Sequence, residues 1–110
     1  MRVWVMSGIH EGDMWASTHL TEKGAVLAAI ADVLEYLNVS DAEGAIDARN
    51  HYGCYSTEAN GDHIEIPWDP SELRKLKSPT LYEIFGQWSE LTQDNDAGYQ
   101  VEIIKTMIEA

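Results

Sequence analysis

The 110-residue chain carries 19 Asp and Glu against seven Lys and Arg, which gives a formal net charge of −12. Its composition, with 45% hydrophobic and 24% charged residues, is typical of globular proteins, and the length is sufficient for one domain with its own hydrophobic core. The acidic balance excludes ordinary binding to nucleic acid or to an anionic membrane, because both require a basic surface. We therefore expect a single acidic domain over residues 1–110.

The sequence predicts neither a membrane span nor a signal peptide. It contains no run of 18 or more apolar residues, and the short apolar start of the chain leads directly into Ser7 and Gly8. The single cysteine, Cys54, excludes an intramolecular disulfide and fits a reducing compartment. We expect a cytoplasmic protein.

The first elements predicted are a hairpin and a helix. Residues 2–7 and 14–20 are rich in β-branched and aromatic residues, and the segment between them, residues 8–13, holds two glycines and an Asp, which indicates a hairpin with a long turn. Apolar residues then recur at helical spacing. Thr21 is a suitable N-cap, so we expect a helix from Glu22 to Leu37.

A second helix and a second hairpin follow. Ser40-Asp41-Ala42-Glu43 has the form of a capping box and predicts a short helix that ends before Gly53. Two short extended runs, Cys54 to Glu58 and His63 to Trp68, flank Asn60-Gly61, a pair that supplies the positive φ angles of a type I′ turn.

The last third predicts two helices and a strand. Asp69-Pro70-Ser71-Glu72 starts a helix of about two turns, and Ser78-Pro79 starts a longer one with a wide apolar face up to Leu91. Tyr99 to Ile108 reads as a closing strand in which Val101 and Ile103 lie opposite Ile104 and Ile108. The predicted order is ββα(α)ββα(α)β. We expect an α+β fold, with an antiparallel sheet of about five strands and the helices packed on one face.

The first turn is one candidate for a catalytic or metal-binding site. His10, Glu11 and Asp13 place an imidazole and two carboxylates beside Gly12, a combination that can transfer protons or bind a metal. Hairpin turns are built from Gly and Asp in any case, so the sequence favours a plain turn there.

A second candidate surrounds the second hairpin. His51, Cys54 and His63 match no standard zinc spacing, and a buried cysteine without a catalytic role is the favoured interpretation. No phosphate-binding, hydrolase or redox motif is present in the sequence, so we predict no cofactor, no metal and no catalytic residue. The alternative is a small metal-dependent or hydrolytic enzyme that uses one of these two groups.

The strongest functional signal is the charge of the middle third. Residues 39–69 hold seven acids and one base, and Glu43 and Asp47 form a like-charge pair at helical i, i+4 spacing, which costs about 0.2–0.5 kcal/mol. We expect one negative face that docks on a basic protein surface by electrostatic steering and charge-assisted hydrogen bonds. Acidity that only keeps the protein soluble is the alternative. The seven carboxylates of this predicted acidic face are Asp41, Glu43, Asp47, Glu58, Asp62, Glu65 and Asp69.

Self-association is another alternative. Trp4 or Trp15 would be an interface anchor if its side chain faced outward on an edge strand. A structural or regulatory homodimer could then form through edge strands.

One segment resembles known proteins. Residues 15–30, Trp-Ala-Ser-Thr-His-Leu-Thr-Glu-Lys-Gly-Ala-Val-Leu-Ala-Ala-Ile, resemble the strand-to-helix segment of small phage- and prophage-encoded proteins, anti-CRISPR proteins among them. The resemblance implies a phage accessory protein that works in the host cytoplasm and inhibits a host nucleic-acid-binding complex by occupying its basic surface. It assigns no role to any residue. Together with the charge, it predicts a non-enzymatic binding protein with a basic protein partner.

Overall fold

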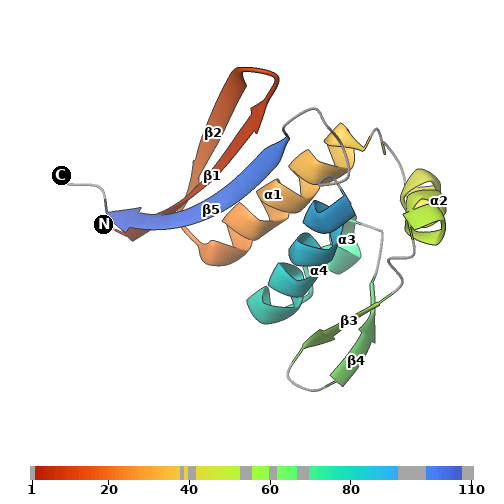
Figure 1. Ribbon diagram of the computed structural model, residues 1–110. Coiled ribbons are helices and arrows are strands. Elements are labelled where there is room, and N and C mark those ends of the chain that lie inside the picture. Colours follow the sequence, from red (N-terminus) through yellow and green to blue (C-terminus); the bar gives the residue numbers. More distant parts are fainter. Residues whose placement is uncertain are drawn as a thin grey trace.

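A computed structural model of the chain describes residues 2–37, 39, 42–52, 56–59, 62–66, 70–91 and 99–107. It has an α+β fold, and the order of strands and helices along the chain is the predicted one (Figure 1). The elements are β1 (Arg2–His10), β2 (Asp13–His19), α1 (Glu22–Tyr36), α2 (Ala42–Tyr52), β3 (Ser56–Ala59), β4 (Asp62–Glu65), α3 (Pro70–Leu73), α4 (Ser78–Leu91) and β5 (Gln100–Met107).

The five strands form two separate sheets, so the prediction of one antiparallel sheet of about five strands is wrong. β1 is the central strand of a three-stranded antiparallel sheet with the order β2-β1-β5, whereas β3 and β4 pair only with each other. The β3–β4 hairpin has strands of four residues, and β3 packs against α4. Figure 1 shows α1 and α4 lying between this hairpin and the larger sheet. Packing of β3 against α4 takes the place of pairing with a sheet edge.

The turn between β1 and β2 is shorter than predicted. His10 pairs with Asp13, so Glu11 and Gly12 alone make the connection, with φ angles of 51° and 89°. Positive φ at both central residues matches the right-handed twist of the flanking strands. Gly8, which was expected in a long turn, is instead an interior residue of β1 and pairs with Trp15.

α1 begins where the sequence predicts. The Thr21 side chain accepts a hydrogen bond from the Gly24 backbone N–H at 3.0 Å, and Thr21 itself has an extended backbone, as an N-cap requires. The helix packs across one face of the three-stranded sheet, and α4 packs on α1 from the far side. The layers therefore run from the sheet through α1 to α4, and α1 is covered on both sides.

The hydrophobic core lies along α1. Val26, Ile30 and Val33, which belong to the predicted helical spacing, are buried, and so are Ala25 and Ala29, which the spacing did not include. Each fully buried Val or Ile side chain contributes about 1.5–3 kcal/mol to folding. The rest of the core comes from β1, α3, α4, β5 and the residues next to them: Met6, Ile66, Leu73, Leu81, Ile84, Trp88, Tyr99 and Val101.

The side chains of β5 alternate between the two faces of the sheet as predicted, with Val101 buried and Ile104 half exposed.

α3 is one turn, Pro70–Leu73, rather than the two turns expected. The hydrogen bonds from the Lys75 and Leu76 N–H groups reach back three residues and end the helix. No helix in the part of the chain that the structure describes is long and apolar enough to cross a membrane.

Candidate functional site

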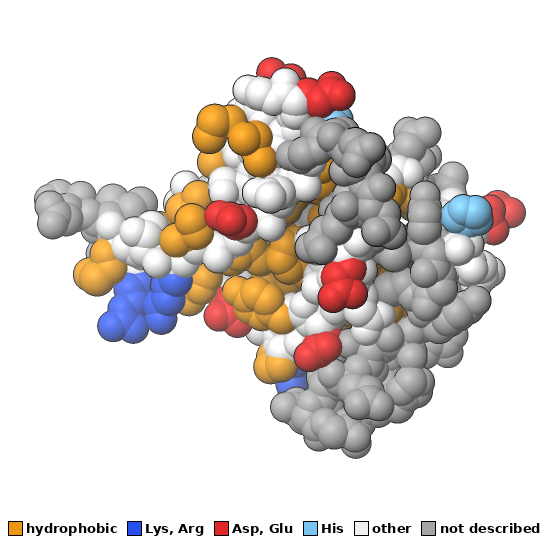
Figure 2. Space-filling model, in the orientation of Figure 1, with side chains coloured by type: hydrophobic (Ala, Val, Ile, Leu, Met, Phe, Trp, Pro, Cys, Tyr) orange, Lys and Arg blue, Asp and Glu red, His pale blue; other side chains and the backbone are white. Residues whose placement is uncertain are grey.

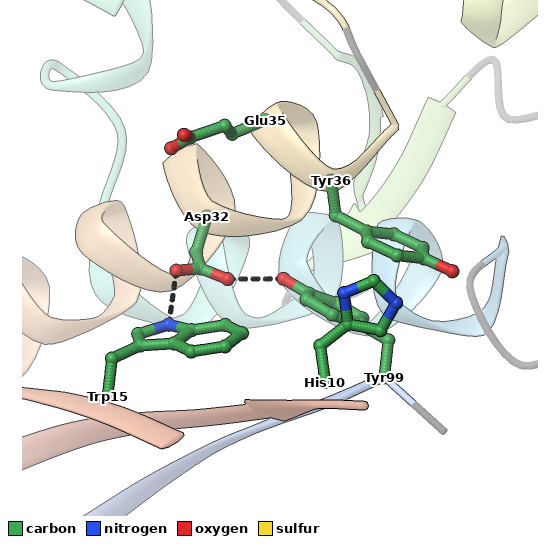
Figure 3. Close-up of a pocket in the computed structure, with 6 residues that line it drawn as sticks. All are labelled: His10, Trp15, Asp32, Glu35, Tyr36 and Tyr99. Atoms are coloured by element: carbon green, nitrogen blue, oxygen red, sulfur yellow. Dashed lines mark hydrogen bonds between the residues drawn. The ribbon is translucent and has the colours of Figure 1, made fainter. Parts of the chain in front are cut away.

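A pocket of about 440 Å³ lies between the C-terminal half of α1 and the tip of the β1–β2 hairpin (Figure 3). This volume falls within the range of small-molecule binding sites. α1 contributes three side chains at i, i+3 and i+4 spacing, so they share one face of the helix. The other side chains come from the end of β1, the start of β2 and the residue before β5. The lining residues are His10, Trp15, Asp32, Glu35, Tyr36 and Tyr99.

Asp32 is the centre of the pocket's hydrogen bonding. Its Oδ2 accepts from the indole N–H of Trp15 at 2.6 Å, and its Oδ1 accepts from the Tyr99 hydroxyl. Figure 3 shows both bonds, with Asp32 pointing from α1 toward the sheet. Because an indole nitrogen can only donate, the half-buried carboxyl of Asp32 must accept there. These two bonds connect α1 to β2 and to the residue before β5.

The pKa of Tyr99 is raised above its ordinary value of 10.0, mainly because the side chain is buried. The hydrogen bond to Asp32 and that residue's negative charge raise the pKa further. The phenol therefore stays protonated over the physiological range and acts as a donor to Asp32, not as a base.

The four aromatic side chains of the pocket lie against one another. Tyr36 and Tyr99 are stacked, with ring centroids 3.9 Å apart and planes inclined by 8°. His10 meets both rings edge-on, at centroid distances of 5.0 and 5.9 Å, and Trp15 lies 6.3 Å from Tyr99. Stacked and edge-on pairs of this kind contribute about 0.5–1.5 kcal/mol beyond simple burial.

Gly8 makes room for the Trp15 ring. A Cβ on Gly8 would lie 2.4–2.6 Å from three atoms of the indole, Cε2, Nε1 and Cζ2, so the face of the ring rests on the Gly8 backbone. A glycine inside a strand often marks such a close approach. The opposite face of the indole is therefore turned toward α1 and Asp32.

The pocket is negatively charged. Among the described residues, Asp32 accepts hydrogen bonds from two neutral groups and pairs with no Lys or Arg. Glu35 is exposed at the rim and adds a second carboxylate. Figure 2 shows acidic side chains at the tip of the β1–β2 hairpin, beside the pocket, and basic ones gathered at the opposite end of the sheet.

The structure separates the members of the first predicted site. His10 points into the pocket, whereas Glu11 and Asp13 are exposed and do not line it. The φ angles of Glu11 and Gly12 confirm the turn itself, and the absence of a catalytic or metal role there stays a prediction. His10 thus enters the pocket with Asp32 and Glu35 rather than with its neighbours in the sequence.

The second predicted group lies mostly beyond what the structure describes. His51 is exposed near the end of α2, Cys54 lies outside the described residues, and the structure places only the backbone of His63, in β4. Among the described residues, no group of three or more His, Cys, Asp or Glu is arranged to hold a metal ion.

The predicted acidic face is described in part. Glu43 and Asp47 are exposed on α2, and the backbones of Glu58, Asp62 and Glu65 lie in the β3–β4 hairpin. Asp41 and Asp69 lie outside the described residues. Lys75, just after α3, forms an exposed ion pair with Glu72 at 3.1 Å. Convergence of the seven carboxylates on one surface stays a prediction.

Neither hairpin tryptophan has the position of an outward-facing anchor. Trp15 is turned toward α1, and the half-buried Trp4 lies on the same face of the sheet, with the Lys105 ammonium 5.6 Å from its ring centroid. β2 and β5 are the outer strands of the three-stranded sheet. A homodimer through these edges stays a prediction.

Sequence reasoning missed most of the pocket. Asp32, Glu35 and Tyr36 share one face of α1, opposite its apolar stripe, where acidic and polar side chains are expected in any case, so nothing in the sequence indicated a pocket. Tyr99 could be placed only by the pairing of β5 with β1, a contact that spans nearly the whole chain.

Comparisons of the chain with protein-family models, curated proteins and solved structures found no match. Function must therefore be inferred from the chemistry of the pocket and the distribution of charge.

Proposed function

We propose that the chain is a non-enzymatic binding protein that docks on a basic protein surface and takes one cationic side chain of that partner into the pocket. The observation that carries this proposal is Asp32, a half-buried carboxylate at the pocket whose hydrogen-bond partners, Trp15 and Tyr99, are both neutral. A cation from a partner would supply the missing charge.

The charge of the whole chain supports the same partner. A net charge of −12 attracts basic surfaces over several ångströms and raises the rate of encounter. Glu43 and Asp47 are exposed and available for steering, while Glu35 stands at the rim of the pocket. The partner would thus be drawn by exposed acids and held by the pocket.

A host protein that binds nucleic acid fits this description, because such surfaces are rich in Lys and Arg. The chain would then act as an inhibitor by covering the surface that otherwise binds phosphates. This identity of the partner, which the resemblance to phage-encoded proteins first suggested, stays a prediction.

Binding to a lysine- and arginine-rich peptide tests the proposal. We would compare the wild type with Asp32→Asn and with Glu102→Gln, which removes a carboxylate from the other face of the same sheet. A charged hydrogen-bonded contact is worth about 1.5–3 kcal/mol, so Asp32→Asn should weaken binding about tenfold or more and Glu102→Gln much less. Equal losses would mean that only net charge matters, and the pocket would have no role.

A competition experiment tests the inhibitory role. A basic protein that binds duplex DNA would be incubated with labelled DNA and increasing amounts of the chain. The chain should displace the DNA without binding the DNA itself, since both compete for the same basic surface. Formation of a ternary complex, with the DNA still bound, would rule out occupation of that surface.

A further inference from the structure

The pocket combines a negative charge with two hydrogen-bond donors that are both already bonded to Asp32. The indole N–H of Trp15 and the hydroxyl of Tyr99 both donate to Asp32, and each of these groups has a single hydrogen to donate. Neither is left to bind an anion. The Tyr36 hydroxyl points away from Asp32 (Figure 3), so this residue presents its ring rather than its polar atom.

What remains at the inner part of the pocket is aromatic surface. Trp15 lines the pocket with one face of its ring covered by Gly8, and the stacked rings of Tyr36 and Tyr99 lie beside it. The negative face of an aromatic ring attracts cations, and Trp attracts them most strongly. This attraction requires no hydrogen bond from the cation.

A primary ammonium or a guanidinium group would be a poorer fit. These groups bring three and five N–H donors, each of which loses a water molecule on entry and requires an acceptor. Each oxygen of Asp32 already accepts one hydrogen bond, so about one lone pair on each is left for these three or five donors. An ammonium whose hydrogens are replaced by alkyl groups has no such requirement and covers more of the aromatic surface.

We propose that the pocket selects an N-alkylated ammonium group, quaternary or highly methylated, over a primary ammonium or a guanidinium group. Asp32 supplies the charge, and Trp15, Tyr36 and Tyr99 supply the contact surface. The inference rests on the proposed function in one respect, since both use the uncompensated charge of Asp32. The group could belong to a free small molecule or to a methylated lysine of a protein.

Titrations followed by nuclear magnetic resonance test this selection. Tetramethylammonium, ammonium and methylguanidinium chlorides would be added separately at constant ionic strength, with the Trp15 indole N–H resonance as the reporter. Tetramethylammonium should shift this resonance and bind about tenfold or more tightly than the other two. Equal or tighter binding of ammonium or methylguanidinium would overturn the proposal.

Two variants locate the binding. Asp32→Asn removes the charge but can keep the network, because the amide oxygen can accept from Trp15 while the amide N–H donates to a rotated Tyr99 hydroxyl. It should abolish most tetramethylammonium binding, whereas the control Glu102→Gln should change it less than about twofold. Unchanged binding in a folded Asp32→Asn protein would overturn the assignment, and its amide spectrum reports folding independently of binding.

Binding of peptides distinguishes a free small molecule from a methylated lysine, and it distinguishes the proposed selection from the proposed function. Tighter binding of a trimethyl-lysine peptide than of free tetramethylammonium would assign the group to a protein, and the reverse order would assign it to a small molecule. If unmethylated basic peptides bind through Asp32 while tetramethylammonium does not, the selection is wrong and the proposed function stands. If tetramethylammonium binds through Asp32 while basic peptides bind independently of it, the selection stands and the proposed function is wrong.

Discussion

Replacing Gly8 with alanine should displace the Trp15 ring and disturb the pocket. The added Cβ would lie 2.4 Å from Cε2 of the indole, whereas ordinary contacts are 3.4–4 Å, so the ring must move by about 1 Å. The Cβ would press on the ring from the sheet side and push it toward α1, so the indole N–H could not keep its present alignment with Asp32 at 2.6 Å.

The expected loss of stability follows from these contacts. A hydrogen bond to a charged group contributes about 1.5–3 kcal/mol, and overpacking costs about 1–3 kcal/mol more. Replacing a glycine lowers the conformational entropy of the unfolded chain, which raises the free energy of unfolding by about 0.4–1 kcal/mol. Gly8→Ala should therefore lower the free energy of unfolding by about 1.5–5.5 kcal/mol, measured by urea denaturation followed by circular dichroism.

Gly86→Ala is a matched control, because a Cβ at that exposed position of α4 would meet nothing within 4 Å. This variant should gain about 0.5–1 kcal/mol from helix propensity. The cost of Gly8→Ala should also largely disappear when Trp15 is already replaced by alanine, which a double-mutant cycle measures. The reasoning would be refuted if Gly8→Ala were as stable as the wild type, or if its cost were unchanged without Trp15.

Four further outcomes follow from the structure. Asp32→Leu should lower the free energy of unfolding by about 2–4 kcal/mol, since Trp15 and Tyr99 both lose their acceptor, whereas Asp32→Asn should stay within about 1 kcal/mol of wild type; urea denaturation of both checks this. Burial and Asp32 raise the pKa of Tyr99 in the folded state, so the protonated hydroxyl stabilises the fold fully below about pH 10, and this stabilisation is lost as the pH rises further. The free energy of unfolding of Tyr99→Phe should therefore fall less steeply than that of the wild type above that pH. Asp47→Lys should stabilise α2 by up to about 0.5 kcal/mol through a new pair with Glu43, yet weaken binding to a basic peptide; no loss of binding would remove α2 from the docking surface. Thr21→Ala should cost about 1 kcal/mol because the Gly24 N–H loses its acceptor, and an unchanged midpoint of thermal unfolding would contradict the cap.

Local signals in the sequence predicted the elements well. The apolar spacing in α1 and α4, the Thr21 cap and the alternation in β5 all depend on residues a few positions apart, and the structure confirms each of them. The division of the strands into two sheets depends on long-range pairing instead. Nothing in the local pattern of β3 and β4 distinguishes a separate hairpin against α4 from two more strands of one sheet.

The pocket could not be predicted from the sequence for the same reason, and Gly8 is the clearest example. As a residue between two extended runs it is typical of a turn, and its role becomes visible only when β2 pairs with β1 and sets Trp15 across from it. Asp32 likewise looks like a solvent-facing acid of an amphipathic helix until Trp15 and Tyr99 are brought to it by two different strand pairings.

The two sets of acids should contribute to binding in different ways because they differ in exposure. Glu43 and Asp47 are exposed, so salt screens them, with a Debye length of about 10 Å at 0.1 M and about 3 Å at 1 M ionic strength. Asp32 is half-buried beside aromatic rings, and a cation in contact with it would be screened much less. High salt therefore removes the attraction that brings a basic partner close and leaves the contact that holds it. The affinity that survives at high ionic strength measures the pocket, and the part that is lost measures the acidic surface.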